Sequence, residues 1–246
     1  MNQKLNIAQG KKCFGFGSAQ TQTKPKNKFK NQMKTCLTSM ASLGNGIVKF
    51  LLVIATLFVA STVSRASSDY GPAYWRPCYP GHYYTSGYGH KFVVIHDMEG
   101  YYLTTISYFK RSSTQASVHY FANGKKDYGS DAPAGEISQG VREAYYAWHV
   151  GCWNRRSLGT EHEGFASHPA WYTDAMYRSS AALQKHLCNK FGIAKDRNHV
   201  VGHNAWQSSA WRSYARSHFG IDPSCNNHTD PGPYWNWTKF MSLVRS

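Results

Sequence analysis

The chain carries two short apolar runs that end in histidine, V-V-I-H at residues 93–96 and V-V-G-H at residues 200–203. A third segment, H-T-D-P-G-P at residues 228–233, places an aspartate in a turn fixed by proline and glycine. β-Branched runs of this kind are typical of buried strands. A lone histidine behind a buried strand is more often a hydrogen-bonded core residue. Two imidazoles and one carboxylate together, however, are ligands that leave a zinc ion's fourth position open for water, as in hydrolytic sites.

Other segments occur around these three in a fixed order. They are S-V-H-Y-F (117–121), A-W-H-V-G (147–151) and N-R-R-S-L-G-T-E-H-E-G (154–164). From about residue 91 to the C-terminus, the chain resembles the zinc-dependent N-acetylmuramoyl-L-alanine amidases of the type-2 amidase family, whose fold peptidoglycan recognition proteins share. G-x-E-x-E-G together with D-P-G-P is the specific part of this resemblance, whereas S-V-H-Y-F alone is weak.

The resemblance implies a metal site and a catalytic base. The zinc ligands are His96, His203 and Asp230, with one ion per chain. Glu161 matches the family's catalytic glutamate, which takes a proton from the attacking water. Some relatives use a tyrosine of the segment at 117–119 instead. Val118 stands there in this chain and cannot exchange protons, so the base is expected to be Glu161.

The same motifs indicate further site residues. His228 is expected to stabilise the oxyanion of the tetrahedral intermediate; the alternative is that it binds zinc in place of Asp230. His119 is expected to be a buried, hydrogen-bonded residue and Glu163 a supporting carboxylate on the same side of its strand as Glu161. The residues expected to contact the substrate are Trp148, His149, Asn154 and Arg155.

Strands and helices alternate from residue 91 onward. Strands are expected at residues 92–95, 118–122, 136–141, 157–163 and 199–202. Helices are expected at residues 103–110, at 174–191 with Asp174 as N-cap and Gly192 as the stop, and at 237–244. This order indicates an α/β fold. With the resemblance, it predicts a single domain with a mixed β-sheet flanked by helices.

Residues 204–227 form a longer connection than compact members of the family use. Aromatic or alanine side chains recur every four positions from residue 206 to 214, so part of the segment should be helical. Two interpretations are open. The segment is a surface excursion pinned by Cys225, or it is a lip of the substrate cleft in which Arg212 and Arg216 hold stem-peptide carboxylates.

The strong basicity of the chain belongs to its leader. Residues 1–66 hold nine Lys and one Arg with no acidic residue, and the other 18 basic side chains face 13 acidic ones. The formal charge of +15 therefore does not indicate a nucleic-acid-binding protein. The apolar run at residues 50–60 is shorter than the roughly 20 residues of a membrane-spanning helix. It resembles a secretory signal cleaved near Ala66, with a membrane anchor as the alternative; Met33 or Met40 is a candidate start.

Residues 67–90, rich in Tyr, Gly and Pro, are expected to be an extended arm packed on the domain at residues 91–246 and tethered through Cys78. Export places the chain in an oxidising compartment, where one or two disulfides are expected. The cysteines beyond the leader are Cys78, Cys152, Cys188 and Cys225, and their pairing is open.

The sequence thus predicts an exported, periplasmic or secreted zinc hydrolase. The resemblance makes it a monomeric amidase that cuts the bond between N-acetylmuramic acid and L-alanine in peptidoglycan or muropeptides, in contact with the membrane only transiently through its leader. The alternative is a non-catalytic peptidoglycan-binding protein on the same fold. Such proteins usually lack a zinc ligand, and this chain keeps all three.

Overall fold

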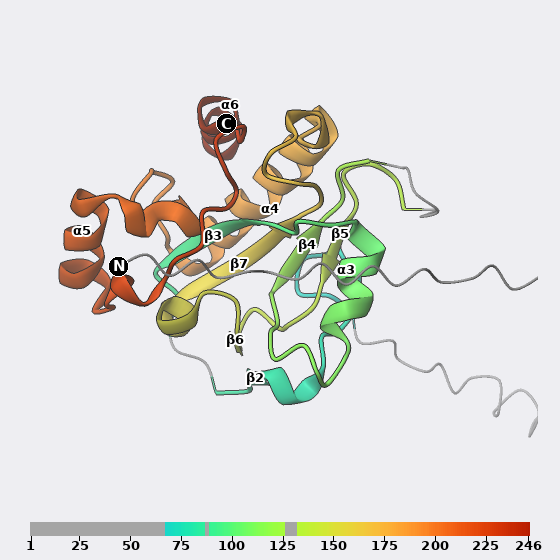
Figure 1. Ribbon diagram of the computed structural model, residues 1–246, viewed down its shortest axis with the longest axis horizontal. Coiled ribbons are helices and arrows are strands. Elements are labelled where there is room, and N and C mark those ends of the chain that lie inside the picture. The colour runs from blue at the N-terminus through green and yellow to red at the C-terminus, as the bar shows by residue number, and fades with distance from the viewer. Residues whose placement is uncertain (1–66, 87–88, 126–131) are drawn as a thin grey trace, which may run out of the picture. The chain divides into compact units, whose positions relative to one another are not determined.

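A computed structural model of the protein describes residues 67–86, 89–125 and 132–246 (Figure 1). The leader, with its apolar run at residues 50–60 and the expected cleavage near Ala66, lies outside the described residues. Among the helices of the described part, none is long and apolar enough to cross a membrane. All described residues belong to one compact unit, as a single domain requires.

A six-stranded sheet with strand order β1-β5-β4-β7-β3-β8 forms the centre of this unit. Its strands are β1 (Tyr74–Trp75), β3 (Phe92–Asp97), β4 (Tyr120–Ala122), β5 (Ile137–Gln139), β7 (Ser157–His162) and β8 (Val200–Gly202). β3 runs parallel to both of its neighbours, β7 and β8, whereas β4 and β5 are antiparallel. The prediction of a mixed sheet is confirmed.

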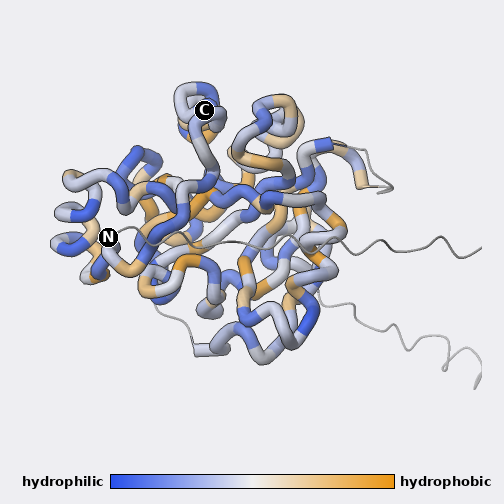
Figure 2. The backbone as a smooth tube through the Cα atoms, in the orientation of Figure 1, coloured by the Kyte–Doolittle hydropathy of each residue, from blue (hydrophilic) through white to orange (hydrophobic). Residues whose placement is uncertain are grey.

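In the described part of the chain, four α-helices flank the sheet (Figure 1). They are α3 (Tyr102–Phe109), α4 (Asp174–Phe191), α5 (Ser209–Phe219) and α6 (Trp237–Arg245). β3 sends alternate side chains into two separate cores, because successive residues of a strand face opposite sides. Val93 and Ile95 pack with side chains of α4 and α6, whereas Phe92 and Val94 pack with side chains of α5. Figure 2 shows hydrophobic residues along these central strands.

The cap of α4 differs from the prediction. Thr173, and not Asp174, precedes the helix, and its side-chain oxygen accepts a hydrogen bond from the Met176 backbone N–H at 3.3 Å. Asp174 is the first helical residue, where its negative charge still suits the positive end of the helix dipole. Gly192 ends the helix at a φ of 64°, as predicted, because glycine adopts this left-handed conformation without strain.

The N-terminal arm is part of the sheet. β1 pairs with β5, and β2 (Tyr83–Tyr84) pairs with β6 (Tyr146–Ala147) in a separate two-stranded ribbon. Cys78 is buried with a free thiol, so the prediction that the arm is tethered through this cysteine is wrong. Strand pairing holds the arm instead. One disulfide is present among the described residues, between Cys152 and Cys225.

Candidate active site

The sheet brings three of the predicted side chains to one edge. His96 on β3 is the register partner of Glu161 on the parallel strand β7. His203 is the first residue of a 3₁₀ turn, η5 (His203–Gln207), that follows β8 directly. Parallel neighbours end at the same edge of a sheet, where α/β proteins usually bind ligands. Asp230 reaches this edge from the loop before α6, and its carbonyl accepts a hydrogen bond from the Asn204 backbone N–H at 3.0 Å.

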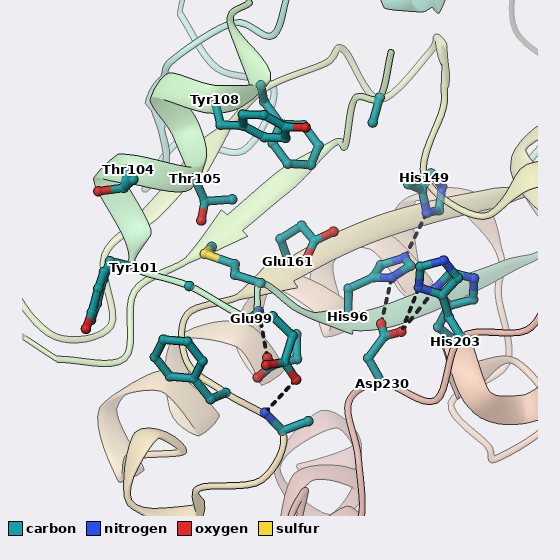
Figure 3. Close-up of a pocket in the computed structure, with 18 of the residues that line it drawn as sticks. His96, Glu99, Tyr101, Thr104, Thr105, Tyr108, His149, Glu161, His203 and Asp230 are labelled. Atoms are coloured by element: carbon teal, nitrogen blue, oxygen red, sulfur yellow. Dashed lines mark hydrogen bonds and ion pairs between the residues drawn. The ribbon is translucent and has the colours of Figure 1, made fainter. Parts of the chain in front are cut away.

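His96, His203 and Asp230 converge on one point (Figure 3). Asp230 Oδ2 lies 3.0 Å from His96 Nδ1, and Asp230 Oδ1 lies 3.3 Å from His203 Nδ1. One candidate ligand atom from each residue lies within 4.8 Å of the others, and no second group of this kind occurs in the described part of the chain. The structure therefore brings together the three residues that the sequence predicted as metal ligands.

The hydrogen bonds of His203 leave its Nδ1 free to bind a metal. The Asn226 amide nitrogen donates to the Val150 carbonyl at 3.1 Å, so the amide oxygen must face His203. That oxygen lies 2.6 Å from His203 Nε2 and can only accept, so Nε2 carries the proton. In the neutral imidazole, the lone pair is then on Nδ1, which points toward Asp230.

A second set of hydrogen bonds has the same effect on His96. The Ser157 hydroxyl donates to the Trp153 carbonyl at 3.0 Å, so it accepts from His149 Nε2 at 3.3 Å. His149 Nδ1 then holds a lone pair and accepts a proton from His96 Nε2 at 3.0 Å. The lone pair of His96 is therefore on Nδ1, facing Asp230. Gly159 makes room for this arrangement, because a Cβ there would lie 2.4 Å from the His149 ring.

Charge and burial also suit a metal. Burial lowers the pKa of His96 and of His149, which keeps both rings neutral and able to offer a lone pair. Burial alone would raise the pKa of Asp230, but the proximity of His203 and His96 holds it below its usual range, so the carboxylate is charged. Two neutral imidazole nitrogens and one carboxylate fit Zn²⁺ with a position left open.

Glu161 lies beside these ligands on the wall of the same pocket. Its Oε2 atom is buried and has no hydrogen-bond partner among the described residues. Burial raises the pKa of Glu161 well above its ordinary value, and the nearby carboxylates of Asp230 and Asp97 raise it further. A carboxylate with an unused acceptor atom and a raised pKa is suited to take a proton from a water molecule in the pocket.

His228 stands at the rim of the pocket. Its side chain is 65% exposed, and its Nδ1 lies 3.8 Å from Asp230 Oδ1. The group of residues that could hold a metal contains Asp230 and leaves His228 out. The geometry thus favours Asp230 as the carboxylate ligand and gives no support to the alternative in which His228 replaces it.

The pocket has a volume of about 1010 Å³ and extends from the ligands toward α3. Trp148 and His149 line it, as predicted, whereas Asn154 and Arg155 are not among its lining residues. Asn154 is buried, and its side-chain oxygen accepts hydrogen bonds from the backbone N–H groups of His149 and Val150. Asn154 therefore holds the chain that presents His149, and the prediction that it contacts substrate gains no support from its position.

The long connection at residues 204–227 contains the predicted helix, α5. Its two arginines do not face the pocket: Arg212 donates to the Trp206 carbonyl, and Arg216 pairs with Asp222 at 3.0 Å. The disulfide at Cys225 attaches the end of the segment to Cys152. The surface excursion pinned by Cys225 is the interpretation that the structure supports.

Two other predicted residues have structural roles. His119 is buried, accepts a hydrogen bond from the Gly159 backbone N–H at 3.1 Å, and contacts the Tyr145 carbonyl with its other nitrogen. Glu163 is buried and accepts backbone hydrogen bonds from Tyr102, at the start of α3, and from Gly124. It positions the helix that forms the far wall of the pocket.

That wall was missed in the sequence. Its side chains are Tyr101, Thr104, Thr105 and Tyr108, at the N-terminus and along one face of α3 (Figure 3). Their spacing of three and four residues is that of a single helical face, so the sequence could have indicated these four residues as one side of the pocket. Asp97 and Asn226 were missed as well. Burial raises the pKa of Asp97 to about 6, although the Tyr172 hydroxyl donates to it at 2.7 Å.

Comparison with known proteins agrees with these features. The chain matches the N-acetylmuramoyl-L-alanine amidase family over residues 86–233. It is 31% identical over 188 residues to N-acetylmuramoyl-L-alanine amidase A of Achromobacter lyticus, covering 72% of this chain and 95% of that protein. It is also 31% identical over 118 residues to the 1,6-anhydro-N-acetylmuramyl-L-alanine amidase AmpD of Salmonella typhimurium, covering 45% of this chain and 52% of that one.

Solved structures of similar proteins include a selenomethionine derivative of AmpD, with a TM-score of 0.46 and 23% identity over 71% of this chain and 96% of that one. The structure of PlyL has a TM-score of 0.47 and 16% identity to this chain, and the match covers 71% of this chain and 97% of PlyL. The family match covers more than half of this chain, and amidase A of Achromobacter lyticus aligns with it over nearly all of the length of amidase A. The chain therefore belongs to the N-acetylmuramoyl-L-alanine amidase family.

Proposed function

We propose that this amidase is an exported, zinc-dependent enzyme that hydrolyses the amide bond between the lactyl group of N-acetylmuramic acid and L-alanine in peptidoglycan. The observation that carries the proposal is the convergence of His96, His203 and Asp230 beside Glu161, whose buried Oε2 atom has no hydrogen-bond partner among the described residues. These three ligands would hold the ion. When bound, zinc supplies Lewis acidity, which acidifies water and polarises the amide carbonyl.

The side chains of the pocket carry the proton transfers. Glu161 accepts a proton from the water that attacks the carbonyl carbon, and passes it to the amine nitrogen of L-alanine as the C–N bond breaks. His228, at the rim, donates a hydrogen bond to the carbonyl oxygen as its negative charge develops. The raised pKa of Glu161 suits this exchange, because the same group must first accept and then release a proton near neutral pH.

Substrate contacts are proposed from the lining of the pocket. Trp148 and the tyrosines Tyr101 and Tyr108 offer aromatic surfaces, and Arg111 offers a positive charge for a carboxylate of the stem peptide. Arg155, which was expected to contact the substrate, is not among the residues that line the pocket, whereas Arg111 is.

Export is supported by the basic leader with its short apolar run, and by the disulfide between Cys152 and Cys225, which persists in oxidising compartments. A monomer remains the expected state.

Mass spectrometry of digested peptidoglycan tests the proposal. The expected products are glycan strands free of peptide and stem peptides with a free L-alanine amino terminus. Enzyme treated with a zinc chelator is the control and should release neither. New reducing sugar ends would indicate a glycosidase instead, and retention on insoluble peptidoglycan without any release would indicate the non-catalytic binding protein.

A further inference from the structure

Asn226 contacts a predicted zinc ligand from a segment to which no role in the reaction has been assigned. The residue is 9% exposed, and its side chain contacts two separate segments. The amide oxygen accepts the Nε2 proton of His203 at 2.6 Å, and the amide nitrogen donates to the Val150 carbonyl at 3.1 Å. Asn226 therefore fixes the orientation of the His203 ring relative to the strand-to-helix connection that contains Val150.

The other imidazole ligand is held from that same connection. His149 directly precedes Val150 in the chain, and its Nδ1 accepts the Nε2 proton of His96 at 3.0 Å. The two zinc-binding rings thus receive their second hydrogen bonds from adjacent segments, one at His149 and one at Asn226. Any movement between these segments would turn one ring relative to the other.

One covalent bond joins these segments. Cys152 lies two residues after Val150, and its partner Cys225 directly precedes Asn226. Both cysteines are exposed, whereas the hydrogen bonds of Asn226 are buried. Neither cysteine of the disulfide is among the residues that line the pocket. The disulfide nevertheless links the segment that contains His149 to the segment that contains Asn226.

We propose that Asn226 is a positioning residue for His203, and that the Cys152–Cys225 disulfide holds it in place, so that the disulfide raises the zinc affinity of a site whose pocket it does not line. This inference rests on the proposed zinc site. An imidazole that is already oriented by a partner on its second nitrogen loses less conformational freedom when it binds a metal. Removing such a partner typically weakens metal binding by about 10–100-fold.

A pair of substitutions at one position separates orientation from packing. Asn226→Leu has a similar volume and cannot accept a proton. Asn226→Asp keeps an acceptor for His203 Nε2, loses the donor to Val150 and adds a negative charge. The zinc dissociation constant is measured by competition with a chelator, and the thermal stability of the metal-free protein is measured in parallel. We expect about 10–100-fold weaker zinc binding in Asn226→Leu and binding within a few-fold of wild type in Asn226→Asp.

The disulfide is tested by the double variant Cys152→Ser/Cys225→Ser. Serine is preferable to a reductant, because liberated thiolates bind zinc themselves. We expect the double-serine variant to bind zinc about tenfold more weakly than wild type. The two serine substitutions should have a smaller effect when Asn226→Leu is already present, because the disulfide and Asn226 both act on the ring of His203. Cys188→Ala, which removes a buried free thiol of α4, is the control and should bind zinc as wild type does.

The outcomes distinguish this inference from the proposed function. Wild-type protein that fails to bind zinc would overturn the proposed function itself. Wild-type zinc affinity in Asn226→Leu, equal losses in the Leu and Asp variants, or a double-serine variant that is less stable without metal but binds zinc normally would each overturn the positioning role alone. Should Asn226→Leu fail to fold, the comparison of Asn226→Asp with the double-serine variant still decides.

Discussion

The ring of His228 is stacked on the ring of His203, with centroids 4.6 Å apart and planes only 3° from parallel. His203 is buried, whereas the side chain of His228 is 65% exposed. The stacking holds a third imidazole beside the two of the predicted ligands without adding it to them. A hydrogen-bond donor in this place could reach a substrate carbonyl in the pocket, which His228 also lines.

Substitution of this residue should therefore separate metal binding from rate. We expect His228→Ala to retain wild-type zinc content and to lose about 10²–10³-fold in kcat, the cost of removing one oxyanion donor elsewhere. Zinc content is measured by elemental analysis and kcat by release of L-alanine amino termini. Loss of the metal in this variant would revive the alternative in which His228 is the third ligand.

Asp230→Ala should lose both zinc and activity, because it removes the one carboxylate of the ligand group. Added zinc should raise the melting temperature of wild-type protein, since a ligand that binds only the folded state stabilises it. The same addition should leave the variant unchanged. Asp174→Ala is the matched control, as this aspartate is exposed at the start of α4. A zinc-dependent rise in the melting temperature of Asp230→Ala would contradict the assignment.

Glu161 and Glu163 lie two residues apart in the chain. The change to glutamine should lower the reaction rate at Glu161 and the stability of the fold at Glu163. Glu161→Gln should lower kcat by about 10²–10⁴-fold and leave the metal-free fold as stable or more so, because burial opposes its charge. Glu163→Gln replaces an acceptor of three backbone N–H groups, those of Tyr102, Gly124 and Lys125. It should cost about 1–3 kcal/mol of the free energy of unfolding.

Activity assays and denaturant unfolding of metal-free protein check both halves of this prediction. An active Glu161→Gln enzyme, within a few-fold of wild type, would remove Glu161 from the role of base. An unchanged unfolding free energy in Glu163→Gln would show that its backbone hydrogen bonds are replaced without cost.

His119 predicts how stability depends on pH. Burial, together with the neighbouring His90, lowers its pKa from 6.5 to about 3. Below pH 6.5 the unfolded chain therefore binds a proton that the folded protein does not, so stability is full above pH 6.5 and falls as the pH drops toward 3. In metal-free protein, His119→Gln should lose less stability over this range than wild type does. Parallel pH curves for the two proteins would count against this explanation.

The leader predicts where the mature chain begins. Because the apolar run at residues 50–60 is followed by S-T-V-S-R-A, a mostly small-residue segment that ends at Ala66, the exported protein should start near Ser67. Residues 1–66 lie outside the described part of the structure, so N-terminal sequencing of protein recovered from outside the cytoplasm is the direct measurement. An intact apolar run in protein extracted from membranes would favour the anchor.

Much of the fold and of the site could be predicted from local pattern. The β-branched runs before His96 and His203 mark β3 and β8, because such runs fit a buried strand. Gly192 stops α4 at the predicted residue, since its left-handed conformation suits glycine. The order of the motifs around Glu161 and Asp230 was enough to name the family. In each case the information lies within a few neighbouring residues.

The partners of these residues were decided only by the tertiary structure. Asn226 and His203 are 23 positions apart, and His149 and His96 are 53 positions apart, so no local period marks either hydrogen bond. The pairing of Cys152 with Cys225 depends likewise on how two surface turns meet. Asn154 looked like a substrate contact because its motif lies near the site, but folding buries it under His149. Local sequence determines what a strand or a turn can be. Which buried polar atoms meet depends on how those elements pack, because most buried donors and acceptors find their partners there.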